Sequence, residues 1–165
     1  MRRDVNDMCE TLEAAVLDQL PLRPAMRIAE IGCGSGDLTW PLATRLPHGQ
    51  VHAIDSAPTM LAVVCERARA AGHANIATYL AAPGEVPLPP GGLDGIHLTL
   101  VLHALPAVVR AGYLARLRAL MRPGGWRSSN GSVAARPVPG RRWPRESPRA
   151  RRARCWPQGA GRRWS

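Results

Sequence analysis

The sequence predicts an α/β protein with a doubly wound, mostly parallel β-sheet that carries helices on both faces. An apolar run at residues 28–31 leads into a loop with three glycines, Gly32, Gly34 and Gly36. A second apolar run, residues 51–54, ends in Asp55. Strand-like and helix-like segments alternate as far as residue 121. A strand, a glycine loop, a helix and a second strand ending in an acid form the plan of a nucleotide-binding βαβ unit.

The first elements follow from hydrophobic spacing. Apolar residues recur at helical intervals over residues 5–20, which predicts an amphipathic helix. Residues 26–31 are apolar without polar alternation, as in a buried parallel strand. Residues 37–46 read as a helix, because a proline is tolerated in its first turn. Residues 51–54 form the second expected strand.

The later elements continue the alternation. Ser56 is a plausible N-cap of a helix that ends at Gly72. Residues 75–81 are a third expected strand, followed by a loop rich in proline and glycine over residues 83–92. The apolar residues 95–102 predict a fourth, central strand. Residues 106–121 carry one apolar face and predict a helix.

The glycine loop indicates a binding site. Glycine lets the backbone turn tightly and approach a ligand, and the helix that follows offers free N–H groups to that ligand. Asp55 can accept hydrogen bonds from both hydroxyls of a ribose. The spacing is G-x-G-x-G with Asp37 next, not the G-x-G-x-x-G of dinucleotide sites, so NAD and FAD are disfavoured. Glu30 would repel a pyrophosphate and suits a ligand with a positive amino group, while Cys33 is expected to be a small filler of the loop.

Composition divides the chain in two. It has 165 residues, enough for about one domain, and all 22 basic residues are Arg. Residues 1–121 hold ten Arg and eleven acids, whereas residues 122–165 hold twelve Arg and one acid, so the net charge of +10 belongs to the C-terminal part. The four cysteines form no C-x-x-C pair and no Cys/His cluster with zinc spacing, so we expect reduced thiols, no metal site and a cytoplasmic protein. No signal peptide or membrane-spanning segment is expected.

Five motifs resemble those of class I S-adenosylmethionine-dependent methyltransferases. The resemblance is to the small-molecule type that includes ubiquinone/menaquinone methyltransferases, and it covers residues 1–125. It implies a Rossmann-like fold, S-adenosylmethionine as the cofactor and a small-molecule methyl acceptor. The motifs are Glu30-x-Gly32-x-Gly34-x-Gly36, Ile54 to Leu61, Leu93 to Ile96, Leu102 to Leu105, and Met121 to Gly125.

The resemblance also implies site residues. Glu30 would anchor the methionine amino group, the loop from Gly32 through Cys33 and Gly34 to Gly36 would pass under the cofactor, and Asp55 would hold the ribose. Ser56 and Met60 would lie near the adenine, although the spacing of Met60 favours a place in the core. The family's usual adenine-binding acid aligns with Ala82, and Glu85 is the nearby substitute. Thr99 would lie where the transferred methyl points, and His103 is the one proposed general base, with a structural role as its alternative.

The pattern stops at Trp126. Residues 126–165 mix Arg, Pro, Gly, Ser and Trp without a period, so we expect a disordered tail and a sheet whose C-terminal strands are missing. A frameshift near codon 125 is our hypothesis, since one codon choice read two bases later gives Ala-Val-Val-Glu-Trp-Gln, a good strand. The central strand would then lie at an exposed edge, and the truncated chain would be weakly active or inactive.

Two other functions stay open. The chain could be a non-catalytic cofactor-binding or partner domain. Alternatively, the Arg-rich segment at residues 149–154 could bind nucleic acid, with Trp143 and Trp156 stacking on bases. A solvated tail without function is the simpler interpretation of those residues.

Overall fold

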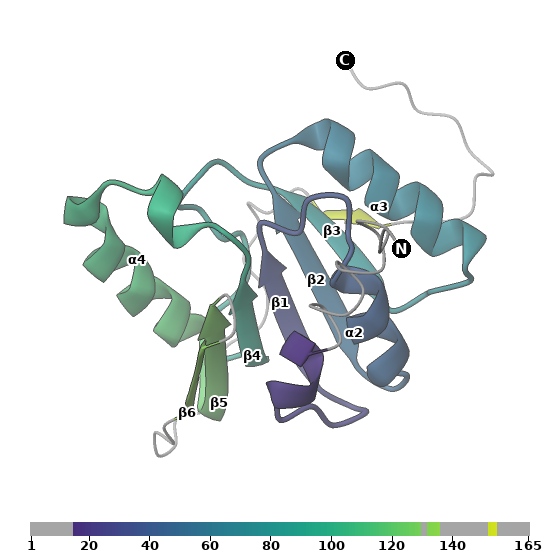
Figure 1. Cartoon of the computed structure of the whole chain (residues 1–165), viewed down its shortest axis with the longest axis horizontal. Helices are drawn as coiled ribbons and strands as arrows, with labels where there is room; N and C mark the ends of the chain where they lie inside the picture. The colour runs from purple at the N-terminus through teal and green to yellow at the C-terminus, as the bar shows by residue number, and fades with distance from the viewer. Residues whose placement is uncertain (1–14, 130–131, 136–151, 155–165) are drawn as a thin grey trace, which may run out of the picture.

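The fold is a seven-stranded sheet between two helical layers (Figure 1). The computed structural model describes residues 15–129, 132–135 and 152–154. The strands are β1 (Arg27–Ile31), β2 (Gln50–Asp55), β3 (Ile76–Leu80), β4 (Leu93–Leu98), β5 (Met121–Ser129), β6 (Ser132–Ala135) and β7 (Arg152–Arg154). The helices are α2 (Thr39–Arg45), α3 (Pro58–Ala70), the short 3-10 helix η1 (Leu102–Ala104) and α4 (Ala107–Leu120), and residues 15–19 are also helical.

Five parallel strands form the centre of the sheet. The strand order is β6-β5-β4-β1-β2-β3-β7. The five inner strands, from β5 to β3 in this order, are parallel to one another, whereas the edge strands β6 and β7 are antiparallel to β5 and β3. The predicted α/β fold with a mostly parallel sheet is therefore confirmed.

The two faces of the sheet have separate cores. On one face, Leu42 of α2 and Val64 of α3 pack with Ile28 of β1 and with Leu17. On the other face, Leu117 of α4 packs with Ala29 and its neighbours. Alternate residues of β1 thus enter opposite cores, as the period of a strand requires. Helices on both faces were predicted, and they are present.

The C-terminal strands contradict the prediction that the sheet is truncated after β4. Residues 121–129 form β5, which pairs with β4, so β4 is a central strand and not an exposed edge. The indole of Trp126 lies over Gly95, where an added Cβ would be 2.3 Å from the ring. Hydrophobic periodicity missed β5 because one large side chain opposite a glycine fills the space that a run of aliphatic side chains would normally fill. The strands β6 and β7 also lie within the expected tail. The rest of the tail after β5, and residues 5–14 of the expected first helix, lie outside the described residues.

Several smaller expectations need correction. Strand β4 begins at Leu93 and ends at Leu98, because the backbone turns at Leu100, whose φ is 53°. Ser56 does not cap α3: the N-cap residue is Ala57, and its N–H is bound by the carboxylate of Asp55. Cys33 is a free thiol, but Cys65 takes part in a disulfide, so the expectation of reduced cysteines is wrong at that position. Within the part of the chain that is described, no helix has the length and apolar character needed to cross a membrane.

Candidate functional site

The glycine loop lies at the point where the order of the parallel strands reverses. The chain runs outward from β1 through β2 to β3, and it then returns to the other side of β1 to form β4. The carboxyl ends of β4, β1 and β2 therefore lie side by side, and the loop leaves the sheet from the end of β1 at Ile31. In open α/β sheets this switch point is where ligands bind.

The three glycines of the loop stand at positions that favour glycine for different physical reasons. All three adopt positive φ angles, 76° at Gly32, 53° at Gly34 and 91° at Gly36. A Cβ on Gly32 would lie 2.5 Å from the carbonyl oxygen of Thr99, and one on Gly36 would lie 3.2 Å from Nε1 of Trp40. At Gly34 no atom lies within 4 Å of that position. Gly32 and Gly36 thus allow close packing, and Gly34 faces open space that a ligand can fill.

Asp55 holds the loop from the end of β2. Its Oδ2 accepts a hydrogen bond of 2.9 Å from the N–H of Gly34, and its Oδ1 accepts one of 2.9 Å from the N–H of Ala57. A carboxylate has about four lone-pair positions, so these two bonds leave each oxygen able to accept another donor. The carboxylate is half-buried at the open side of the loop, which suits a ligand with hydroxyl groups.

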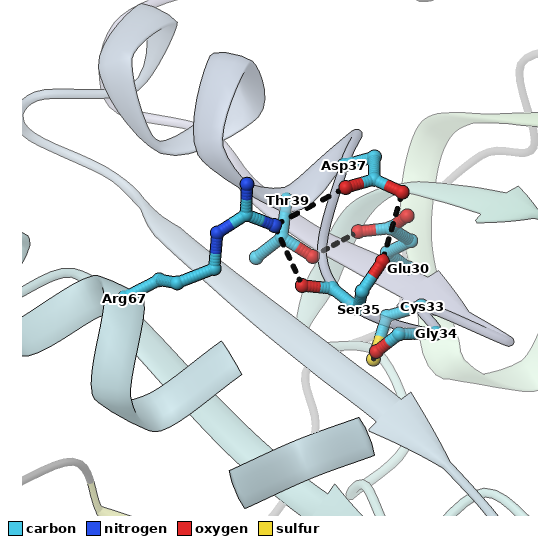
Figure 2. A network of polar contacts seen from close by, with 7 residues as sticks. All are labelled: Glu30, Cys33, Gly34, Ser35, Asp37, Thr39 and Arg67. Atoms are coloured by element: carbon cyan, nitrogen blue, oxygen red, sulfur yellow. Dashed lines mark hydrogen bonds and ion pairs between the residues drawn. The ribbon is translucent and has the colours of Figure 1, made fainter. Parts of the chain in front are cut away.

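Glu30 is buried on β1, two residues before the first glycine of the loop. Its side chain is 1 % exposed, and its Oε2 accepts a hydrogen bond of 2.5 Å from the hydroxyl of Thr39, the first residue of α2 (Figure 2). Burying a carboxylate costs free energy unless polar groups replace its water. Thr39 supplies one such partner, and it was not identified from the sequence because its contact with Glu30 forms only when α2 packs against β1.

The two carboxylates make the loop electrostatically negative. Burial raises the pKa of the Cys33 thiol well above its usual value, and the charges of Glu30 and Asp55 raise it further. The thiol stays protonated, so it is a poor nucleophile. This agrees with the expectation that Cys33 is a filler. A ligand with a positive charge is favoured beside such a loop, and an anionic pyrophosphate is disfavoured.

Of the other predicted site residues, one lies beside the loop and four are exposed. Thr99 follows β4 directly, and its backbone packs against Gly32, so this residue is beside the loop. Ser56 and Met60 are exposed at the start of α3, and Met60 is 42 % exposed, so it is not a core residue. Glu85 is exposed on the loop after β3, and His103 is exposed on η1. The side chains of both residues make no hydrogen bond or ion pair with the described residues.

Two features of the site were not foreseen. Arg67 of α3 contacts the outer side of the glycine loop through Ser35 and Asp37. His97 of β4 is buried beside Glu30 in the sheet register, and burial lowers its pKa to about 4. Neither residue belongs to a sequence motif. Each is brought to the site by the packing of a strand or a helix, which the sequence pattern does not display. Among the described residues, no group of three or more His, Cys, Asp or Glu side chains could hold a metal ion.

A family model described as a methyltransferase domain matches residues 28–125. The chain is 33% identical over 114 residues to a trans-aconitate 2-methyltransferase of Rhodopseudomonas palustris, with 67% of this chain and 40% of that protein covered. It is 36% identical over 108 residues to a release factor glutamine methyltransferase of Moorella thermoacetica, with 62% of this chain and 38% of that protein covered. The chain thus spans less than half the length of these curated relatives.

The fold is similar to that of coclaurine N-methyltransferase, whose crystal structure contains N-methylheliamine and SAH. The TM-score is 0.66 and the identity is 18%, with 77% of this chain and 37% of that chain covered. At this identity the similarity concerns the fold alone.

Proposed function

Because the chain belongs to the methyltransferase domain family, we propose that it binds S-adenosylmethionine at the glycine loop and transfers the methyl group to a small-molecule acceptor. The observation that carries the proposal is the open space over Gly34, whose N–H is bound by the carboxylate of Asp55, with the buried carboxylate of Glu30 four residues earlier on β1. These acids fit a ligand that has ribose hydroxyls at one end and a cationic amino group at the other. The cofactor supplies the reactive carbon and the leaving group when bound.

Each residue of the loop has a defined part in the proposal. Asp55 accepts hydrogen bonds from the ribose hydroxyls while it holds the N–H of Gly34. Glu30 provides negative charge for the amino group, directly or through water. The glycines and Cys33 keep the loop thin enough for close approach. Ser56 and Met60 flank the adenine from the start of α3, and Glu85 contacts it from the loop after β3.

The protein contributes mainly by alignment. Methyl transfer from a sulfonium is a direct displacement, so holding the acceptor in line supplies much of the rate. Thr99 lies beside Gly32 at the end of β4, next to the place proposed for the transferred methyl. His103, exposed on η1, is the residue we propose for removing a proton from an oxygen or nitrogen acceptor.

The acceptor we propose is a small molecule, and a small tricarboxylic acid is the first compound to test, because one curated relative is named for trans-aconitate. A second relative is named for release factor glutamine. A panel of small carboxylic acids and a glutamine-containing release factor peptide, incubated with radiolabelled cofactor, separates the two classes. Methylation of the peptide alone would contradict the proposed acceptor.

Calorimetry tests the cofactor site. The wild-type chain should bind S-adenosylmethionine and S-adenosylhomocysteine. Asp55→Ala should weaken both by about ten- to a hundredfold, which is the effect of losing hydrogen bonds to a charged group. Asp18→Ala, at an exposed acid paired with Arg45, is the matched control and should bind normally. Absence of binding by the wild-type chain would remove the proposal.

Two alternatives have their own outcomes. Cofactor binding without methyl transfer to any acceptor would favour a non-catalytic cofactor-binding domain. Binding of nucleic acid that falls steeply with salt would favour the Arg-rich segment at residues 149–154 as an interface. The expected cytoplasmic location was drawn from reduced thiols, so the disulfide of Cys65 does not support it, and cell fractionation can test it.

A further inference from the structure

Arg67 connects helix α3 to the outer side of the glycine loop. Its Nη1 donates a hydrogen bond of 3.3 Å to the carbonyl oxygen of Ser35 and lies 3.2 Å from Oδ1 of Asp37. The hydroxyl of Ser35 donates a bond of 2.8 Å to Oδ2 of the same Asp37. Figure 2 shows the guanidinium directed at these two residues. Arg67 thus binds both the backbone of Ser35 and the carboxylate of Asp37, two residues further along the chain.

The same guanidinium also contacts Trp40. Its Cζ lies 5.5 Å from the centre of the indole ring, within the range of a cation–π interaction. The indole in turn packs against Gly36, whose Cα leaves no room for a side chain on that side. Arg67 therefore restrains the loop on both sides of the Ser35–Gly36 peptide.

This restraint matters because a glycine-rich backbone is costly to hold in one conformation. Glycines populate many backbone conformations in the absence of external contacts, so fixing Gly34 and Gly36 at positive φ costs conformational entropy. Asp55 fixes the inner side through the N–H of Gly34. Arg67 of α3 binds the carbonyl of the next residue, Ser35.

We propose that Arg67 is a positioning residue that preorganises the glycine loop for S-adenosylmethionine. The inference rests on the proposed function, because it assumes that the cofactor lies over Gly34. Arg67 does not touch the ligand in this arrangement. It lowers the ordering cost that binding would otherwise include, so its removal should weaken cofactor affinity and leave the chemical step unchanged.

The experiment is calorimetry with S-adenosylhomocysteine on the wild type and four variants. The wild type is compared with Arg67→Met, which keeps an apolar stem over Trp40 but has no donor or charge, and with Arg67→Lys, which keeps the charge. Arg69→Ala is the matched control, because Arg69 is an exposed Arg in the same last turn of α3 whose side chain makes no ion pair with the described residues. Asp37→Asn tests the carboxylate that Arg67 binds.

Arg67→Met should raise the dissociation constant about three- to tenfold, the range of a partly exposed charged contact together with a cation–π contact. Arg67→Lys should recover part of the loss, Asp37→Asn should weaken binding in the same direction, and Arg69→Ala should match the wild type. The difference between wild type and Arg67→Met should shrink in high salt, because the contacts are exposed enough to be screened. Amide hydrogen exchange of residues 32–38 should be faster in Arg67→Met than in Arg69→Ala.

With an identified acceptor, Arg67→Met should raise KM for the cofactor and leave kcat within about twofold, since only the uniform binding term changes. Equal affinity of the wild type and Arg67→Met for S-adenosylhomocysteine would overturn the role of Arg67 and leave the proposed function standing. Absence of binding by the wild type would overturn the proposed function and this inference together. A loss of affinity in Arg69→Ala equal to that in Arg67→Met would also overturn it, because the effect would then belong to helix charge.

Discussion

The buried His97 should make the protein sensitive to mild acid. His97 lies on β4, between Glu30 of β1 and Ser128 of β5 in the sheet register, and it is 3 % exposed. Its Nδ1 has no hydrogen-bond partner among the described residues. Burial lowers its pKa from 6.5 to about 4. The folded protein therefore keeps this side chain neutral where the unfolded chain would protonate it.

The sign of the effect follows from proton linkage. Between pH 6.5 and 4 the unfolded state binds the proton of His97 and the folded state does not, so the free energy of unfolding falls as the pH falls. The slope is about 1.4 kcal/mol for each pH unit. Over the whole interval the loss approaches about 3 kcal/mol, a large part of the 5–15 kcal/mol that is typical of a domain (about 0.1 kcal/mol for each residue). Above pH 6.5 this contribution is constant.

Urea unfolding at pH 7.5, 6.5, 5.5 and 4.5 measures the slope. His97→Leu should have a smaller loss of stability on acidification than the wild type, because an apolar side chain removes the group that titrates. His103→Leu is the control, since His103 is exposed on η1, and it should follow the wild type. Titratable groups far from His97 affect all three proteins alike, so the difference reports on His97 and its immediate surroundings. Equal slopes for His97→Leu and the wild type would refute the reasoning.

Three further predictions concern glycines of the sheet and of the loop. Gly95→Ala should destabilise the protein by about 1–3 kcal/mol, measured by urea unfolding, because its Cβ would overlap the indole of Trp126. Gly32→Ala should cost more stability than Gly34→Ala, since a Cβ on Gly32 meets the backbone of Thr99 and one on Gly34 meets open space; the reverse order in thermal unfolding would contradict this. Gly34→Ala should instead weaken cofactor binding in calorimetry. Resequencing codons 120 to 165 tests the frameshift hypothesis, which an intact frame with no homologous strand in the alternate frame would end.

The central βαβ unit was predictable because its signals are local. The apolar run of β1, the glycine spacing and the acid at the end of β2 all lie within residues 28–55. Each signal reflects the backbone or the burial of a single segment. Asp55 could be assigned a place at the strand end for the same reason, although its bond to the N–H of Gly34 depends on two segments that are 21 residues apart in sequence.

Strand β5 shows where local signals fail. Its residues lack an apolar period, and hydrophobic patterning therefore predicted a tail from Trp126 onward. In the sheet, Trp126 lies opposite Gly95, so the missing side chain of one strand matches the large side chain of the next. The buried carboxylate of Asp94 likewise forms an ion pair with Arg122 of β5 and accepts a hydrogen bond from the N–H of Arg27 of β1. Such complementarity is a property of pairs, and a single segment does not display it.

The amino-acid sequence by itself determined the type of fold, the position of the glycine loop and the acids that flank it, because backbone freedom and burial are encoded residue by residue. Only the tertiary structure decided which glycine faces open space, that Arg67 and Trp40 hold the loop from outside, and that His97 is buried and neutral. These features arise when packing brings distant segments together, and the free energy of a contact depends on both of its partners.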